Sequence, residues 1–143
     1  MSINSNTELD KKSAIGLDSF YTISVIGKGS YAKVLLVKKK DTHRFYAMKI
    51  MKKDSIERKN QKTHVKNERD ILVGIEECPF IVKLYYTFQT DKKLYFVLEY
   101  CPGGELFNLL QKKRRLSEEQ TRFYAAQLVL ALEHLHNQDV IYR

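Results

Sequence analysis

A lysine and a glutamate, 19 residues apart, are the side chains best suited to chemistry on a phosphate group. Lys49 lies in FYAMKIM, where apolar neighbours leave its ammonium in need of an anionic partner. Ala47 projects to the same face of this strand, and its small side chain leaves space for a flat ring. Glu68, in HVKNERDILVGI, supplies a carboxylate that can hold the ammonium toward phosphates. By spacing alone such a glutamate is more often a surface residue, so the pairing depends on the surrounding motifs.

A glycine-containing stretch, Gly27-x-Gly29-x-x-Ala32, precedes the lysine strand. A dinucleotide-binding turn of this type requires a helix that starts inside the motif, whereas YAKVLLV, which follows here, is typical of a strand. The two glycines are therefore predicted at the tip of a hairpin, which covers phosphates with backbone N–H groups. Val34, on the second strand, can cover the same ring as Ala47. An ordinary glycine-containing hairpin is the alternative for this stretch alone, and the lysine strand argues against it.

Composition limits the class of protein. The chain has 143 residues, of which 43% are apolar, enough for one packed domain. Its two cysteines, Cys78 and Cys101, stand in no metal-binding pattern, which argues against zinc and disulfide scaffolds and fits a reducing cytosol. No apolar run approaches the roughly 18 residues of a membrane span, and the polar first residues do not resemble a signal peptide. The net charge of +8 is scattered, so solvated surfaces explain it about as well as a binding patch, and a nucleic-acid partner is disfavoured.

Hydrophobic patterning predicts the order of the elements. A polar arm over residues 1–18 precedes three antiparallel strands, in FYTISVIG, YAKVLLVKKK and FYAMKIMKK, with DTHR as a turn between the last two. An amphipathic helix is predicted at about 62–76. A second hairpin is predicted in IVKLYYTFQT and KLYFVLEY. CPGG then forms a link whose proline and glycines indicate a special backbone conformation.

Two more helices are predicted after this link. The first is short and covers about 104–111. The second opens at Ser117, because Gln120 three residues later completes a capping box. This last helix is apolar nearly all round, so it expects protein on several sides. Its apolar residues include Phe123, Ala126, Leu128, Val129, Leu130, Leu132 and Leu135.

Taken together, Gly27–Val34, YAMK, NERDIL, CPFIV, LEYCPGGELF and the closing IYR resemble the AGC group of Ser/Thr protein kinases. This group includes protein kinase C, protein kinase B and the cyclic-nucleotide-dependent kinases. The resemblance covers about residues 20–143, and the combination of motifs is highly specific. GKGSYAKVLLV is most similar to atypical protein kinase C, whereas EYCPGGELF is more similar to the ribosomal-protein kinases, so the subgroup stays open.

The resemblance implies an α+β fold: a protein-kinase N-lobe, built from a five-stranded antiparallel sheet and one major helix, with the first helices of an incomplete C-lobe. It divides the chain into a flexible arm (1–19) and a partial kinase domain (20–143). Within that domain it implies an N-lobe (20–100), a hinge (99–104) and the start of the C-lobe (105–143).

The resemblance also implies an ATP site. The glycine-rich loop covers ATP with Tyr31 at its tip, and Ala32 departs from the commoner glycine, which affects the flexibility expected of the loop rather than ATP binding. Lys49 contacts the α- and β-phosphates and pairs with Glu68; these two are the catalytic residues expected in this chain. Val34 and Ala47 cover adenine, with Leu106 beneath it and Leu98 as the gatekeeper. The implied ATP-binding residues are Ile26, Gly27, Lys28, Gly29, Ser30, Tyr31, Ala32, Lys33, Val34, Ala47, Lys49, Glu99, Cys101 and Glu105.

Several of these residues carry a more detailed expectation. Glu99 and Cys101 bind adenine through their backbones, and a reactive thiol at Cys101 is a less favoured alternative. Glu105 contacts the ribose and a basic residue upstream of the substrate Ser or Thr, although an acid in the first turn of a helix is also favoured by the helix dipole. Leu72 and Leu84 pack in the column between the lobes. His64 and Arg143 face a phosphate on the activation loop.

The implied function is that of an ATP-dependent Ser/Thr protein kinase. Its cofactors are ATP and Mg²⁺, its partners are proteins with basic residues upstream of Ser or Thr and an upstream activating kinase, and its location is the cytoplasm, with the nucleus as a second location. The catalytic aspartate and the metal ligands are expected beyond Arg143, so no metal ligand is assigned here. The 143-residue chain is accordingly expected to be inactive alone and prone to association. A non-catalytic nucleotide-binding or docking module is the alternative.

Overall fold

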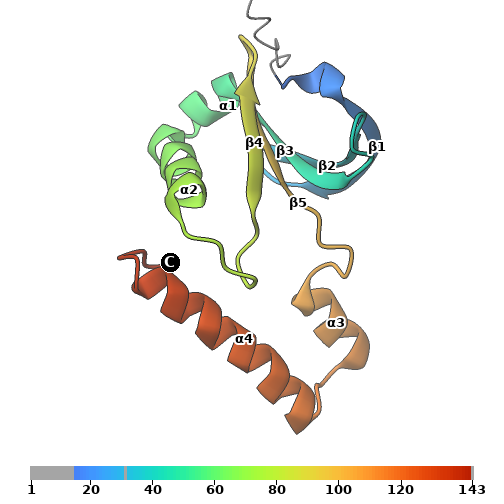
Figure 1. The fold of residues 1–143 in the computed structure, drawn as a ribbon, viewed down its shortest axis with the longest axis vertical. Coiled ribbons are helices and arrows are strands. Elements are labelled where there is room, and N and C mark those ends of the chain that lie inside the picture. Colours follow the sequence, from blue (N-terminus) through green and yellow to red (C-terminus); the bar gives the residue numbers. More distant parts are fainter. Residues whose placement is uncertain (1–14, 31, 143) are drawn as a thin grey trace, which may run out of the picture.

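The computed structural model of the protein describes residues 15–30 and 32–142. A five-stranded antiparallel sheet with the strand order β1-β2-β3-β5-β4 forms its first part (Figure 1). The strands are β1 (Phe20–Lys28), β2 (Ala32–Lys39), β3 (Phe45–Lys52), β4 (Leu84–Gln89) and β5 (Lys93–Glu99). A short 3-10 turn, η1 (Leu17–Ser19), leads into β1. The predicted α+β class, the first three strands and the second hairpin are confirmed.

Four α-helices lie in the part of the chain that the structure describes: α1 (Lys53–Arg58), α2 (Lys62–Gly74), α3 (Leu106–Lys113) and α4 (Glu118–His136). The helices predicted at 62–76, at 104–111 and after Ser117 are confirmed, with ends that differ by about two residues. The separate helix α1 was not predicted. It ends because Asn60 takes a left-handed conformation, with φ of 51°, and no proline or glycine marks this break.

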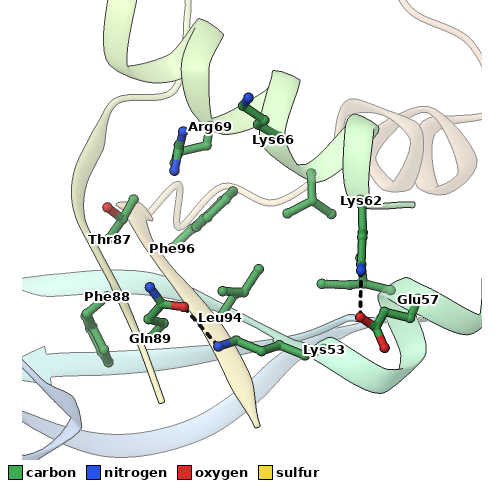
Figure 2. Close-up of a pocket in the computed structure, with 12 residues that line it drawn as sticks. Lys53, Glu57, Lys62, Lys66, Arg69, Thr87, Phe88, Gln89, Leu94 and Phe96 are labelled. Atoms are coloured by element: carbon green, nitrogen blue, oxygen red, sulfur yellow. Dashed lines mark hydrogen bonds and ion pairs between the residues drawn. The ribbon is translucent and has the colours of Figure 1, made fainter. Parts of the chain in front are cut away.

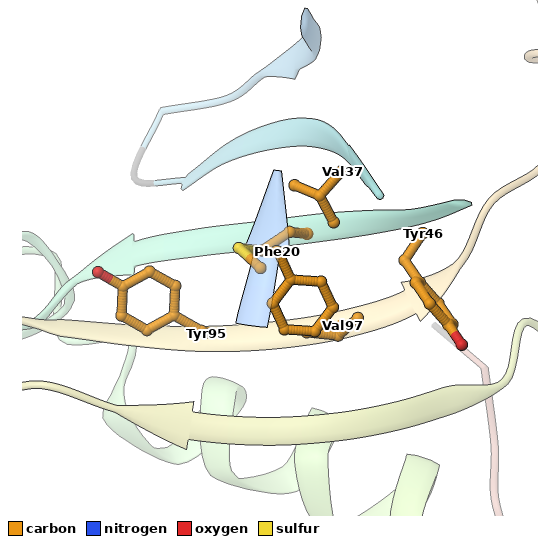
Figure 3. Packing of buried hydrophobic residues seen from close by; sticks show 6 residues of the cluster. Phe20, Val37, Tyr46, Tyr95 and Val97 are labelled. Carbon is orange, nitrogen blue, oxygen red and sulfur yellow. The ribbon is translucent and has the colours of Figure 1, made fainter. Parts of the chain in front are cut away.

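The central strand β3 separates two kinds of environment. Tyr46 and Met48 point to one face of the sheet and are buried, whereas Ala47, Lys49 and Met51 point to the other. The first face carries an apolar cluster to which β1, β2, β3 and β5 all contribute (Figure 3). Its buried members are Phe20, Val37, Tyr46, Met48, Tyr95 and Val97. Burial of each such side chain stabilises the fold by roughly 1.5–3 kcal/mol relative to exposure. This face of the sheet therefore carries a hydrophobic core.

The opposite face of the sheet is covered by the two helices that follow β3. Ile56 of α1 and Val65 of α2 are buried against Met51 of β3 and Phe96 of β5. This packing fixes α2 over the face that carries Lys49. Glu68 lies three residues after Val65, so both are on the same side of the helix, toward the sheet. The second cluster thereby sets the position of the carboxylate.

Helices α3 and α4 lie beyond the end of the sheet, at the bottom of Figure 1. The predicted capping box of α4 is present: the Gln120 N–H donates to Ser117 Oγ at 3.2 Å, and the Ser117 N–H donates to Gln120 Oε1 at 3.3 Å. Near its other end, α4 meets the α2–β4 link, where Gln138 Oε1 accepts from the Glu76 N–H at 3.1 Å. Phe123 stays largely exposed, in agreement with a helix that expects other protein around it.

No helix of the described ranges, 15–30 and 32–142, is long and apolar enough to cross a membrane.

An ion pair between a buried lysine and an exposed aspartate lies where β2 turns toward β3. Lys39 is only 5% exposed, and its ammonium donates to the carboxylate of Asp41 and lies 5.7 Å from the centre of the Tyr86 ring. The hydrogen bond to Asp41 raises the pKa of Lys39, against the opposing effect of burial. The same hydrogen bond lowers the pKa of Asp41 below its ordinary value. Asp41 therefore stabilises the folded protein only while its carboxyl group is ionised.

We expect Asp41→Asn to lower the melting temperature at pH 7, because the buried Lys39 ammonium loses its charged partner. The difference from the unmodified protein should shrink as the pH falls through the lowered folded pKa of Asp41, since the protonated carboxyl group no longer pairs. Thermal unfolding of the full-length protein between pH 7 and pH 3 measures this. Asp91→Asn, in the exposed β4–β5 turn, is the matched control. A difference that is as large at pH 3 as at pH 7 would contradict the assignment.

Candidate nucleotide-binding site

Lys49 and Glu68 form the pair that the sequence predicted. Lys49 Nζ donates to Glu68 Oε1 at 2.6 Å and to Oε2 at 2.8 Å, so both carboxylate oxygens hold one ammonium. The side chains are 19% and 34% exposed, respectively. The strand β3 that carries Lys49 is paired on both sides, with β2 and with β5. The ammonium is thus fixed from the strand and from α2, and among the described residues its third N–H has no acceptor, which leaves it for an anionic ligand.

Apolar side chains share the face of the sheet that carries Lys49. Val34 stands directly opposite Lys49, and Ala47 stands directly opposite Leu98 of β5. Directly opposed residues share a face of the sheet, so these four side chains lie on one face. Val34, Ala47 and Leu98 are half-buried. The arrangement suits a flat apolar ring whose charged substituent extends toward Lys49.

The glycine-rich stretch is a strand–turn–strand, as predicted, since no helix starts within it. Its tip is closed by the Gly29 N–H, which donates to the Ala32 carbonyl at 2.8 Å. Gly27 pairs with Val34, and a Cβ atom at Gly27 would lie 3.3 Å from Val34 Cβ, which is tighter than ordinary contact. Glycine at this position therefore lets the backbone lie close to the apolar surface. Tyr31, predicted at the tip, lies outside the described residues.

The link after β5 forms a tight turn. The Gly104 N–H donates to the Cys101 carbonyl at 3.2 Å, and Gly104 has φ of +73°, a conformation that favours glycine. Glu99 is fixed at the strand end, where its N–H donates to the Lys83 carbonyl at 2.9 Å. The backbone N–H of Cys101 has no hydrogen-bond partner among residues 15–30 and 32–142. Among the described residues, this donor is therefore available to a ligand.

Glu105 and Leu106, which follow the turn, have different surroundings. Glu105 is exposed and is the N-cap residue of α3, but its side chain makes no capping hydrogen bond, so its carboxylate is accessible. Leu106 lines a cavity with Tyr124 and Leu128 of α4. Its side chain is partly exposed, and its place beneath adenine stays a prediction.

The remaining predicted residues lie around α2. Leu72 and Leu84 line one cavity between α2 and β4, and their place in a column between the lobes stays a prediction. His64 is exposed, and its Nδ1 lies 2.9 Å from Gln61 Oε1. It also lines a cavity of about 760 Å³ that includes Tyr142. Arg143 lies outside the described residues.

Another cavity, which the sequence did not reveal, lies between α1, α2, β4 and β5 (Figure 2). It measures about 370 Å³, and Phe96, Leu94 and Val65 supply apolar lining. Four basic side chains also line it: Lys53, Lys62, Lys66 and Arg69. Three of them are engaged: Lys62 pairs with Glu57 at 2.6 Å, Lys53 donates to Gln89 at 2.9 Å, and Arg69 Nε donates to Asp70 Oδ1 at 2.9 Å. The cavity suits an apolar group with negative charge beside it. The sequence alone explained these charges equally well by solvated surface or by a binding patch, because it did not place α1 beside the distant strand β4.

Comparison with known proteins agrees with this geometry. The protein kinase domain family matches residues 20–143. The RAC family serine/threonine-protein kinase homolog of Dictyostelium discoideum is 47% identical over 99% of this chain and 32% of its own length. Serine/threonine-protein kinase SCH9 of Saccharomyces cerevisiae is 50% identical over 93% of this chain and 16% of its own. Human serine/threonine-protein kinase Sgk2 is 49% identical over 87% of this chain and 34% of its own.

The chain belongs to the protein kinase domain family. The resemblance to AGC-group Ser/Thr protein kinases that the motifs indicated is confirmed by these relatives. The chain spans about a third or less of the length of the curated relatives it matches.

We expect Gly104→Ala to destabilise the full-length protein by about 1–2 kcal/mol, because a Cβ atom is strained at a positive φ. Gly103→Ala is the matched control: a Cβ atom there meets nothing within 4 Å, and the backbone does not have a positive φ. Urea unfolding of both variants gives the comparison. Equal stability of the two variants would show that the turn does not depend on the conformation of Gly104.

Proposed function

We propose that this chain supplies the ATP-binding lobe of a Ser/Thr protein kinase, which transfers the γ-phosphoryl group of ATP to protein hydroxyl groups. The observation that carries the proposal is the two-oxygen contact of Glu68 with the Lys49 ammonium, beside a glycine-containing hairpin. Membership of the protein kinase domain family supports it. The functional divisions in this proposal are an arm (1–19), an N-lobe (20–100), a hinge (99–104) and the start of a C-lobe (105–143).

In this proposal each part of the site contacts one part of ATP. Adenine lies on Val34 and Ala47, and its edge bonds to the backbone of Glu99 and Cys101. The phosphates lie under the hairpin tip and against Lys49, which Glu68 keeps in place. The residues fit such a ligand because the Cys101 N–H is unpartnered among the described residues and the Gly27 backbone lies close to Val34.

Magnesium would add neutralisation of phosphate charge when it is bound. Within residues 15–30 and 32–142, no group of three or more His, Cys, Asp or Glu side chains is placed to hold a metal ion. No step is therefore assigned to magnesium, and what this part of the protein contributes is nucleotide position. Positioning and fixed charge account for most of the catalysis of phosphoryl transfer.

We expect Lys49→Met to reduce phosphoryl transfer by at least about 100-fold while the protein stays folded, because a fixed positive charge at the phosphates is lost. Glu68→Gln should cause a smaller loss, since an amide still accepts a hydrogen bond but carries no charge. Transfer from radiolabelled ATP to a basic peptide, with thermal unfolding in parallel, measures both effects in the full-length protein. Lys52→Met, on the exposed end of the same strand, is the charge-matched control. Near-normal turnover of Lys49→Met would overturn the proposal.

Substrate choice is part of the same proposal. Glu105 presents an accessible carboxylate directly after the turn that would hold adenine, close to the expected path of a bound peptide. We expect peptides with Arg or Lys upstream of the target Ser or Thr to be preferred, and Glu105→Gln to reduce that preference by about fivefold, as for an exposed charge pair. Glu119→Gln, an exposed glutamate on α4, is the control. A peptide-array profile without a basic preference, or one unchanged in Glu105→Gln, would contradict this role.

Regulation and location are also part of the proposal, and family membership supports them. We propose that an upstream kinase activates the protein and that the exposed His64 on α2 helps to bind the resulting phosphate. A cytoplasmic location, with the nucleus as a second one, is proposed on the same basis.

A further inference from the structure

One hydrogen bond joins the tip of the glycine-rich hairpin to the link between α1 and α2. Its donor is not one of the residues assigned to ATP. Lys59 Nζ donates to the main-chain carbonyl oxygen of Ser30 at 2.8 Å. Ser30 lies at the tip between β1 and β2, whereas Lys59 directly follows α1. The two residues are 29 positions apart in the sequence. The contact therefore bridges two separate parts of the fold.

The backbone that carries Lys59 is firmly anchored. Asn60 adopts its left-handed conformation while its N–H donates to the Glu57 carbonyl at 2.9 Å, and the Gln61 N–H donates to the Ile56 carbonyl at 2.8 Å. Ile56 is only 3% exposed and belongs to the second core cluster. The Lys59 carbonyl in turn accepts from Gln61 Nε2 at 3.1 Å. The core thus fixes the turn from which the ammonium extends.

The Ser30 carbonyl lies outside the pairing of the hairpin. The last paired residues of β1 and β2 are Lys28 and Lys33, and the Gly29–Ala32 hydrogen bond closes the turn beyond them. Lys59 Nζ is the partner of this carbonyl among the described residues. Because the acceptor is a main-chain atom, the Ser30 side chain is not required for the contact.

The same segment leads directly into α2. Gln61 is the N-cap residue of α2, which carries Glu68 seven residues later. A bond from Lys59 to the hairpin tip consequently links the position of the loop to that of the helix that supplies the carboxylate. We propose that Lys59 is a positioning residue, which ties the glycine-rich hairpin to the α1–α2 link and so prepares the site for the nucleotide phosphates. This inference rests on the proposed ATP-binding function.

Hydrogen exchange tests the tether directly and without nucleotide. In the full-length protein, Lys59→Met should increase amide exchange of the β1–β2 hairpin, with little change in the melting temperature, because Lys59 is exposed. Lys59→Arg should restore part of the protection, since it keeps a charged donor. Ser30→Ala should resemble the unmodified protein, and so should Lys92→Met, which removes an equal charge from the exposed β4–β5 turn. Unchanged exchange in Lys59→Met, or an equal rise in Lys92→Met, would overturn the tether.

Affinity for a fluorescent ATP analogue tests its consequence. Lys59→Met should bind the analogue about three- to fivefold more weakly, the size expected for an exposed charged contact, while Lys92→Met binds normally. In transfer assays the loss should appear in KM for ATP rather than in kcat, because the contact orders the site before nucleotide binds. Equal affinity of Lys59→Met and the unmodified protein would overturn the positioning role alone. Absence of binding by the unmodified protein would instead overturn the ATP-binding function and this role with it.

Discussion

The ion pair between Lys49 and Glu68 is the interaction on which the arrangement of this lobe depends. An ammonium on a central strand, among apolar neighbours, is costly unless a carboxylate meets it. The carboxylate comes from α2, which must therefore lie over that face of the sheet. Val65 and Phe96 hold the helix there by apolar packing. The same core cluster that stabilises the fold thus determines the geometry of the charged pair.

Local sequence patterns were sufficient to predict the features that depend on the spacing of apolar residues and on the residue types at turns and helix ends. Alternation in FYAMKIM predicted that Ala47 and Lys49 share a face, and a strand after the glycines excluded a helix-based phosphate site. The capping box at Ser117 predicted the start of α4. In each case the signal lies within a few residues, where side-chain direction follows from the backbone alone.

Features that depend on contacts between distant segments were not predictable in the same way. Helix α1 has six residues, too few for a periodic pattern, and its place is set by the burial of Ile56 against the sheet. The basic cavity between α2 and β4 requires those two elements to be placed together first. The cavity that Leu106 lines with Tyr124 and Leu128 was not predictable either, because it requires α3 and α4 to be placed together.

The two ends of the proposed nucleotide site differ in how they are built, and the forces that act at each end explain why. Packing against a ring falls off steeply with distance, so Val34 and Ala47 stand on paired strands that cannot shift independently. Attraction between an ammonium and a phosphate decays only as the inverse of distance, and it tolerates small displacements. The hairpin tip over the phosphates can accordingly be exposed, closed by one backbone bond and held from outside by Lys59. A rigid surface for the ring and a lightly tethered cover for the charges are therefore compatible within a single sheet.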